Sequence, residues 1–155
     1  MAKKNLPKIL IVCSSGGHLL QFYQLRGWWS KYERVWVTFD KQDSQCLLEG
    51  EKMYPAYFPT TRNIPNFLKN ILLSIRVLLV ERPDIVVSTG AGVAVPFFYL
   101  AKLIRAKTIF IEAFNRVSSP TLTGRLVYPV SDIFFVQWES QRKNYKKSRL
   151  LGRLL

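Results

Sequence analysis

Short apolar runs alternate with longer segments of helical periodicity along the whole chain. The runs are rich in β-branched and aromatic residues, which is typical of strands covered on both faces. The predicted strands are Ile9–Cys13, Arg34–Phe39, Ala56–Pro59, Asp84–Ser88, Thr108–Ile111 and Ile133–Val136. The predicted helices are Leu19–Lys31, Gln42–Lys52, Ile64–Glu81, Val93–Ile104, Leu122–Tyr128 and Glu139–Tyr145. This alternation predicts a Rossmann-like, doubly wound parallel sheet in a single α/β domain over residues 1–155.

Ligands of such sheets bind at the carboxyl ends of the strands, so the loops after the strands form the candidate site. Two of these loops are glycine turns, containing Ser14, Ser15, Gly16 and Gly17 after the first strand and Thr89, Gly90 and Gly92 after the fourth. Their backbone N–H groups could cradle an anion, or the glycines could serve only the geometry of a tight turn. Both interpretations stay open, because neither turn matches a nucleotide-binding fingerprint.

Two ionisable residues at strand ends are candidates for chemistry. His18 is the only histidine and begins a helix, where the helix dipole would lower its pKa and favour a general base. A structural or surface role is the alternative. Glu112 ends an apolar strand, where a carboxylate contributes little to solubility. Pairing with Arg116 or Arg125 is the structural alternative for Glu112.

The segment Ile64–Glu81 is apolar around nearly its whole circumference. A helix of this kind is either deeply buried or partly sunk in a membrane interface. We expect a mixed role, in which one side packs on the sheet and the other side meets lipid. The residues assigned to lipid contact are Phe67, Leu68, Lys69, Leu72 and Arg76.

The chain carries 23 Lys and Arg residues against 10 Asp and Glu, a formal net charge of +13. This excess implies an anionic partner, such as a phosphorylated ligand, anionic lipid or nucleic acid. The basic segment Arg142–Leu155 either binds an anion or is simply solvated. The sequence has no nucleic-acid-binding signature and no Cys or His spacing typical of a metal site. The apolar run before Ser14 is too short for a signal peptide or a membrane span.

Three stretches together resemble the Alg14-type family: SSGGHLLQ from Ser14, STGAGVAVP from Ser88, and the segment from Phe110 to Leu154 that begins FIEAFNRV. The most specific part runs from Glu112 through Gly124 to the final LGR. Members of this family are membrane-associated, acceptor-binding subunits of two-component UDP-sugar glycosyltransferases. Bacterial relatives serve the synthesis of capsule and exopolysaccharide.

The resemblance implies the N-terminal half of a split, inverting GT-B glycosyltransferase that uses no metal or other cofactor. A partner subunit would bind the UDP-sugar. This chain would bind a polyprenyl-pyrophosphate-linked saccharide at the cytoplasmic face of the membrane, and would not bind nucleic acid. The implied roles are catalysis for His18 and Glu112, and contact with the acceptor or its phosphates for Ser14, Ser15, Gly16, Gly17, Thr89, Gly90, Gly92, Asn115 and Arg116.

Eukaryotic members carry an N-terminal membrane helix, for which this sequence leaves no room before its first strand. The expectation is therefore peripheral binding to an anionic membrane surface. One domain cannot hold both halves of a GT-B enzyme, so we expect little nucleotide-sugar binding and little activity from this chain alone. Two other interpretations remain: a non-catalytic membrane scaffold that recruits and activates the partner, and a nucleotide- or nucleic-acid-binding Rossmann module.

Overall fold

The computed structural model describes residues 6–154, which contain one seven-stranded sheet in the order β3-β2-β1-β4-β5-β6-β7. The strands are β1 (Ile9–Cys13), β2 (Arg34–Phe39), β3 (Met53–Ala56), β4 (Ile85–Gly90), β5 (Lys107–Ile111), β6 (Ile133–Val136) and β7 (Arg149–Leu150). Every neighbouring pair is parallel, and the strand order reverses between β1 and β4. The predicted fold class is confirmed, and the reversal places the expected binding crevice beside these two strands.

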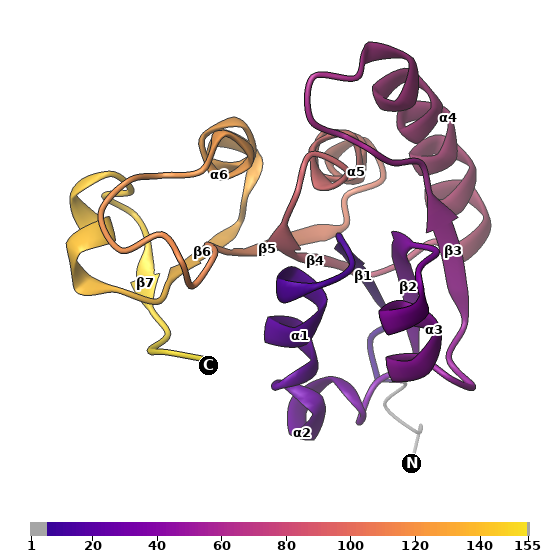
Figure 1. The fold of residues 1–155 in the computed structure, drawn as a ribbon, viewed down its shortest axis with the longest axis horizontal. Coiled ribbons are helices and arrows are strands. Elements are labelled where there is room, and N and C mark those ends of the chain that lie inside the picture. Colours follow the sequence, from indigo (N-terminus) through magenta and orange to yellow (C-terminus); the bar gives the residue numbers. More distant parts are fainter. Residues whose placement is uncertain (1–5, 155) are drawn as a thin grey trace.

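Helices cover both faces of the sheet (Figure 1). They are α1 (Gly17–Tyr23), α2 (Arg26–Trp29), α3 (Gln42–Leu47), α4 (Ile64–Glu81), α5 (Ala94–Leu103) and α6 (Leu122–Val127), with short 3₁₀ helices η1 (Tyr128–Val130) and η2 (Glu139–Lys143). Alternate residues of β1 point to opposite faces, so Leu10 and Val12 join the core under α4, α5 and α6. Ile9 and Ile11 join the core under α1 and α2.

Four predicted elements have the observed bounds: β1, β2, α4 and β6. The predicted helix Leu19–Lys31 is wrong as one element, because the chain breaks after Tyr23 and resumes as α2. In a continuous helix, residues seven apart would be separated by about 10.5 Å along the axis. The break allows Phe22 and Trp29 to pack edge-on against the same Trp36 ring, at centroid distances of 5.6 and 5.3 Å.

The fourth and fifth strands and helices α5 and α6 differ from their predicted bounds by one or two residues, and three other elements differ more. The third strand lies at Met53–Ala56 rather than Ala56–Pro59, since Pro55 is tolerated on an edge strand. The predicted helix from Gln42 ends at Leu47, before Gly50 with its positive φ of 79°. The last predicted helix is the 3₁₀ helix η2, and the basic C-terminal segment also supplies the edge strand β7, which the sequence did not predict.

Helix α4 buries several polar side chains and exposes many of its apolar ones. Asn63 caps its first turn by accepting a hydrogen bond from the Asn66 N–H. Its buried face includes the polar side chains of Asn70, Ser74 and Glu81. Its exposed side carries large apolar residues at helical spacing: Ile64, Leu68, Leu72, Ile75, Leu79 and Val80. Packing on the sheet therefore explains only part of the apolar character of this helix.

Candidate functional site

A cleft of about 690 Å³ lies at the carboxyl ends of the central strands. It is lined by residues from the turns after β1 and β4, the β2–α3 and β3–α4 loops, and the start of α6. The lining residues are Ser14, His18, Phe39, Lys41, Phe58, Pro59, Thr60, Thr61, Arg62, Gly90, Ala91, Gly92, Arg116, Thr121, Leu122 and Thr123. The structure thus brings both predicted glycine turns to one cavity, as the topology requires.

His18 is held by two hydrogen bonds to one residue of the neighbouring turn. Its Nδ1–H donates to the carbonyl oxygen of Thr89 over 2.8 Å, and the Thr89 hydroxyl donates to the His18 carbonyl over 2.7 Å. With Nδ1 protonated, the neutral ring presents Nε2 as a proton acceptor. Burial lowers the pKa of His18 below its usual 6.5, against opposing effects of the Thr89 carbonyl and the charge of Glu112. The imidazole is therefore held neutral at pH 7.

Gly90 allows the His18 ring to lie against the backbone of the second turn. It has a φ of 130°, and a Cβ at this position would lie 2.7 Å from His18 Cε1. No side chain fits in that space without moving the imidazole, and L residues rarely adopt this φ. The glycine is required at this position for the geometry of the histidine.

The cleft is strongly basic. Lys41, Arg62 and Arg116 line it together with His18, and among the described residues that line it there is no Asp or Glu. None of these three cations forms a salt bridge with another residue between 6 and 154. The Lys41 ammonium lies 4.6 Å from the centroid of the Phe58 ring. Such a surface favours a ligand with negative charge and one apolar side.

The segment 57–62 contributes five lining residues that sequence reasoning missed. Asn70 of α4 holds this segment, since its amide nitrogen donates to the Tyr57 carbonyl and its oxygen accepts from the Tyr57 N–H. The predicted third strand, Ala56–Pro59, covered two of these residues, and the loop after it was not among the loops predicted to form the site. Lys41, by contrast, lies in the loop 40–43 after the second strand, which was predicted to be part of the site.

The first glycine turn is only partly open to the cleft. Ser14 lines it, whereas Ser15, Gly16 and Gly17 do not. The Gly16 N–H already donates to a carboxylate oxygen of Asp43 over 2.5 Å. An anionic group of the protein itself therefore occupies one of the backbone donors assigned to an acceptor phosphate.

Glu112 is buried, and its carboxylate accepts four hydrogen bonds. One carboxylate oxygen accepts from the Ala113 N–H and the Thr121 hydroxyl, both at 2.9 Å. The other accepts from the Tyr145 hydroxyl at 2.6 Å and the Thr121 N–H at 3.2 Å. Burial and this contact with Glu112 raise the pKa of Tyr145. The structural alternative for Glu112, pairing with Arg116 or Arg125, is not observed among the salt bridges of residues 6–154. Glu112 instead ties the ends of the 113–121 loop together.

The remaining predicted residues fall in different places. Thr89 is buried beneath His18, Gly92 lines the cleft, and Asn115 is exposed outside the set of lining residues. On α4, Leu68, Lys69, Leu72 and Arg76 are exposed and Phe67 is half-buried. Of the helices within residues 6–154, none has both the length and the apolar character needed to cross a membrane. No group of three His, Cys, Asp or Glu side chains in the same range could hold a metal ion.

The parallel sheet, its strand order and the cleft at the strand ends define a Rossmann-like domain equivalent to the N-terminal half of a GT-B enzyme. The chain belongs to the Alg14 family, described as oligosaccharide biosynthesis proteins, whose sequence profile matches residues 57–154.

Known relatives and solved structures agree with this assignment. The chain is 28% identical to the UDP-N-acetylglucosamine transferase subunit ALG14 of Candida albicans, covering 96% of this chain and 78% of that protein. The human subunit of the same name is 26% identical, with 95% and 82% covered. MurG of Acinetobacter baumannii has a similar structure, with a TM-score of 0.70, 17% identity and coverage of 86% and 43%. UDP-GlcNAc 2-epimerase of Neisseria meningitidis, solved with UDP-GlcNAc, has a TM-score of 0.73 and 15% identity, covering 95% of this chain and 47% of that chain. The chain thus spans less than half the length of these solved structures.

Proposed function

We propose that this chain is the acceptor-binding subunit of a two-component inverting glycosyltransferase. A partner subunit binds the UDP-sugar, and this chain presents a polyprenyl-pyrophosphate-linked saccharide at the cytoplasmic face of the membrane. The observation that carries the proposal is a cleft that combines a neutral, oriented imidazole with three unpaired cations and no carboxylate lining. Family membership and the names of the relatives, which are transferase subunits, support it.

In the proposed reaction, Nε2 of His18 accepts the proton of the acceptor hydroxyl while the hydroxyl oxygen attacks the anomeric carbon of the donor sugar. The bond from that carbon to the UDP oxygen breaks, and UDP leaves on the partner's side. Thr89 keeps the correct tautomer of His18 through the 2.8 Å hydrogen bond to Nδ1. Arg62, Arg116 and Lys41 bind the acceptor pyrophosphate, and the bonds of Glu112 to the 113–121 loop position Arg116.

The catalytic role of Glu112 is an untested prediction. We propose instead that Glu112 positions the 113–121 loop. Its two oxygens already accept four hydrogen bonds from Ala113, Thr121 and Tyr145. We propose no phosphate contact for Ser15, Gly16, Gly17 and Asn115, since none of these residues lines the cleft.

The helical face around α4 provides the proposed membrane contact. Helices α4, α5 and α6 lie in sequence on one face of the sheet (Figure 1). Each has large exposed apolar side chains, among them Leu68 and Leu72 on α4, Leu103 on α5 and Leu122 on α6. Leu122 also lines the cleft, so an acceptor with its pyrophosphate in the cleft could extend its polyprenyl chain onto this surface. Lys69 and Arg76 beside the α4 residues suit anionic lipid headgroups.

The test of catalysis is transfer of radiolabelled sugar to a lipid-linked acceptor by the chain co-expressed with its partner. We expect His18→Ala to lower turnover by about 10²–10⁴-fold with the complex still assembled, which is the usual contribution of a general base. The matched control is Gln24→Ala, an exposed position at the end of the same helix, and it should leave turnover unchanged. Unchanged turnover in His18→Ala would instead support the non-catalytic scaffold.

The test of the membrane face is sedimentation with vesicles containing phosphatidylglycerol. We expect Leu68→Gln combined with Leu72→Gln to weaken binding by at least tenfold. The reason is that burial of each leucine side chain in lipid would contribute roughly 1.5–3 kcal/mol to the binding free energy. The control is Leu20→Gln, an exposed leucine of α1 on the other face of the sheet. Equal binding by the α4 variant and the wild-type chain would exclude α4 as the membrane contact.

A further inference from the structure

A second basic cavity shares no lining residue with the cleft and has no role in the proposed function. Its volume is about 480 Å³, and its lining includes Tyr128, Asp132, Phe134, Lys143, Lys146 and Lys147. We call it the lysine pocket. Asp132 directly precedes β6, so the pocket lies toward the amino ends of the strands, whereas the cleft lies at their carboxyl ends. It is therefore separate from the proposed acceptor site.

The lysine pocket carries uncompensated positive charge. Within residues 6–154, none of Lys143, Lys146 and Lys147 forms a salt bridge. Asp132, the acid among the lining residues, is already neutralised, because one of its oxygens contacts the Lys102 ammonium at 2.6 Å. Its other oxygen accepts from the Thr108 N–H at 2.7 Å. Burial alone would raise the pKa of Asp132, but the contacts with Lys102 and Thr108 together lower it. The carboxylate therefore stays ionised and paired with these two residues.

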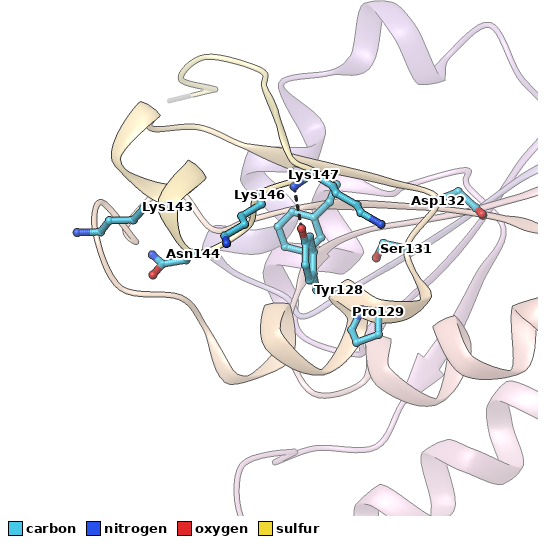
Figure 2. A pocket seen from close by; sticks show the side chains of 9 residues that line it. Tyr128, Pro129, Ser131, Asp132, Lys143, Asn144, Lys146 and Lys147 are labelled. Carbon is cyan, nitrogen blue, oxygen red and sulfur yellow. Dashed lines mark hydrogen bonds between the residues drawn. The ribbon is translucent and has the colours of Figure 1, made fainter.

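The aromatic floor of the pocket is held rigidly. The Tyr128 hydroxyl accepts a hydrogen bond from the Lys147 N–H at 2.8 Å. The Tyr128 ring packs edge-on against Phe134 at 5.1 Å and contacts Tyr145 at the same distance. In Figure 2, the Lys146 and Lys147 side chains extend to either side of the Tyr128 ring, while Lys143 extends away from it. Two ammonium groups thus flank a ring whose hydroxyl accepts from Lys147 and donates to no other residue between 6 and 154.

We propose that the lysine pocket binds a phosphate group. Two flexible ammonium groups and a phenolic hydroxyl match the acceptor oxygens of a phosphate ester, and the ring accommodates the carbon skeleton attached to it. The phosphate could belong to a lipid headgroup or to a soluble phosphate ester. The pocket adjoins η1, which continues directly from α6, one of the helices of the proposed membrane face. A headgroup held here would fix the orientation of the domain on a membrane.

The test is a titration of the ¹⁵N-labelled full chain, followed by amide chemical shifts. The three probes are inorganic phosphate, glycerol 3-phosphate and dihexanoylphosphatidylglycerol below its micelle concentration. We expect saturable shifts at the amides of Lys147 and Asp132. Lys146→Gln combined with Lys147→Gln should weaken the affinity about tenfold or more, since the double variant removes both ammonium groups beside the phosphate. Saturation by the lipid alone identifies a headgroup site, and equal affinity for the soluble probes identifies a soluble phosphate ester.

The control removes the same charge from the opposite face of the sheet, with Arg26→Gln in α2 and Lys31→Gln just after it. Equal weakening in both double variants would mean general charge attraction and would overturn the proposal, as would the absence of saturable shifts. Unchanged amide shifts outside the pocket establish that each variant is folded. The readout is independent of the acceptor cleft, so His18→Ala should leave these shifts unchanged whether or not the proposed transferase function is correct.

Discussion

The chemistry of His18 depends on two neighbours that belong to a different turn, 71 and 72 positions further along the chain. Thr89 fixes the tautomer of the imidazole through its carbonyl oxygen, and Gly90 leaves the space in which the ring lies. Burial then lowers the pKa of the ring. A free histidine at the start of a short helix would have none of these constraints, so the catalytic potential of His18 is a property of the pair of turns.

Gly90→Ala should displace the His18 ring, because the new Cβ would lie 2.7 Å from Cε1 and the residue would keep a strained positive φ. We expect at least a tenfold loss of transfer by the partner complex and a loss of about 1–3 kcal/mol in unfolding free energy. The control Gly27→Ala adds a methyl group on α2 with no atom within 4 Å, and it should not destabilise the chain. Full activity of Gly90→Ala would contradict the proposed position of the base.

The pH dependence of transfer should report the pKa of His18. Because this pKa is lowered in the folded chain, the acid limb of kcat/KM is expected below pH 6.5, measured on the partner complex. The unfolded chain binds this proton more readily, so stability should fall as pH drops through 6.5 and should not depend on His18 above it. An acid limb that persists in His18→Asn would have to be assigned to another group.

At the scale of elements, α4 joins the core, the cleft and the proposed membrane face. Asn70 on its buried side holds the segment that carries Arg62 into the cleft. About three turns further on, Glu81 anchors the helix to the start of β1 and to β3, where it contacts Lys8, Lys52 and Tyr54. The polar side chains of the buried face therefore fix the helix, and its exposed apolar side chains remain available for lipid.

Glu81→Gln should destabilise the chain, because it removes the buried carboxylate that pairs with both lysines, leaving Lys8 with only the exposed Glu33 and Lys52 with no salt bridge among residues 6–154. Burial would raise the pKa of Glu81, but hydrogen bonds from Lys52, Lys8 and Tyr54 outweigh it and lower the pKa to about 2. We expect a loss of about 3 kcal/mol at pH 7 by urea denaturation. This contribution is complete above pH 4.5 and disappears as pH falls toward 2, so the variant should show a flatter acid profile.

The control for Glu81 is Glu33→Gln, which breaks the exposed contact of Glu33 with Lys8 and should cost less than about 1 kcal/mol. A loss in Glu81→Gln no larger than in Glu33→Gln would show that the buried carboxylate does not anchor α4.

At the scale of the whole molecule, the chain corresponds to one half of the solved enzymes it resembles. Its net charge of +13 suits the proposed acceptor with its pyrophosphate and the proposed contact with anionic lipid. In the proposed assembly, binding of the donor and binding of the acceptor belong to different polypeptides.

The isolated chain should therefore show no saturable binding of UDP-GlcNAc in a calorimetric titration, whereas the complex with its partner should bind it. The partner alone is the matched control, and it should retain most of the donor affinity. Tight binding of UDP-GlcNAc by the isolated chain would contradict the division of labour between the two subunits.

The sequence by itself determined the fold class, the bounds of β1, β2, α4 and β6, and the expectation that both glycine turns lie at one edge of the sheet. These features follow from local periodicity and from the geometry of parallel sheets, which any strand–helix alternation obeys. The three-dimensional structure was needed to show that Arg62 and the segment before it line the cleft, and that Glu112 bonds to Thr121 and Tyr145. Those contacts join residues distant in the chain, and local patterns do not encode them.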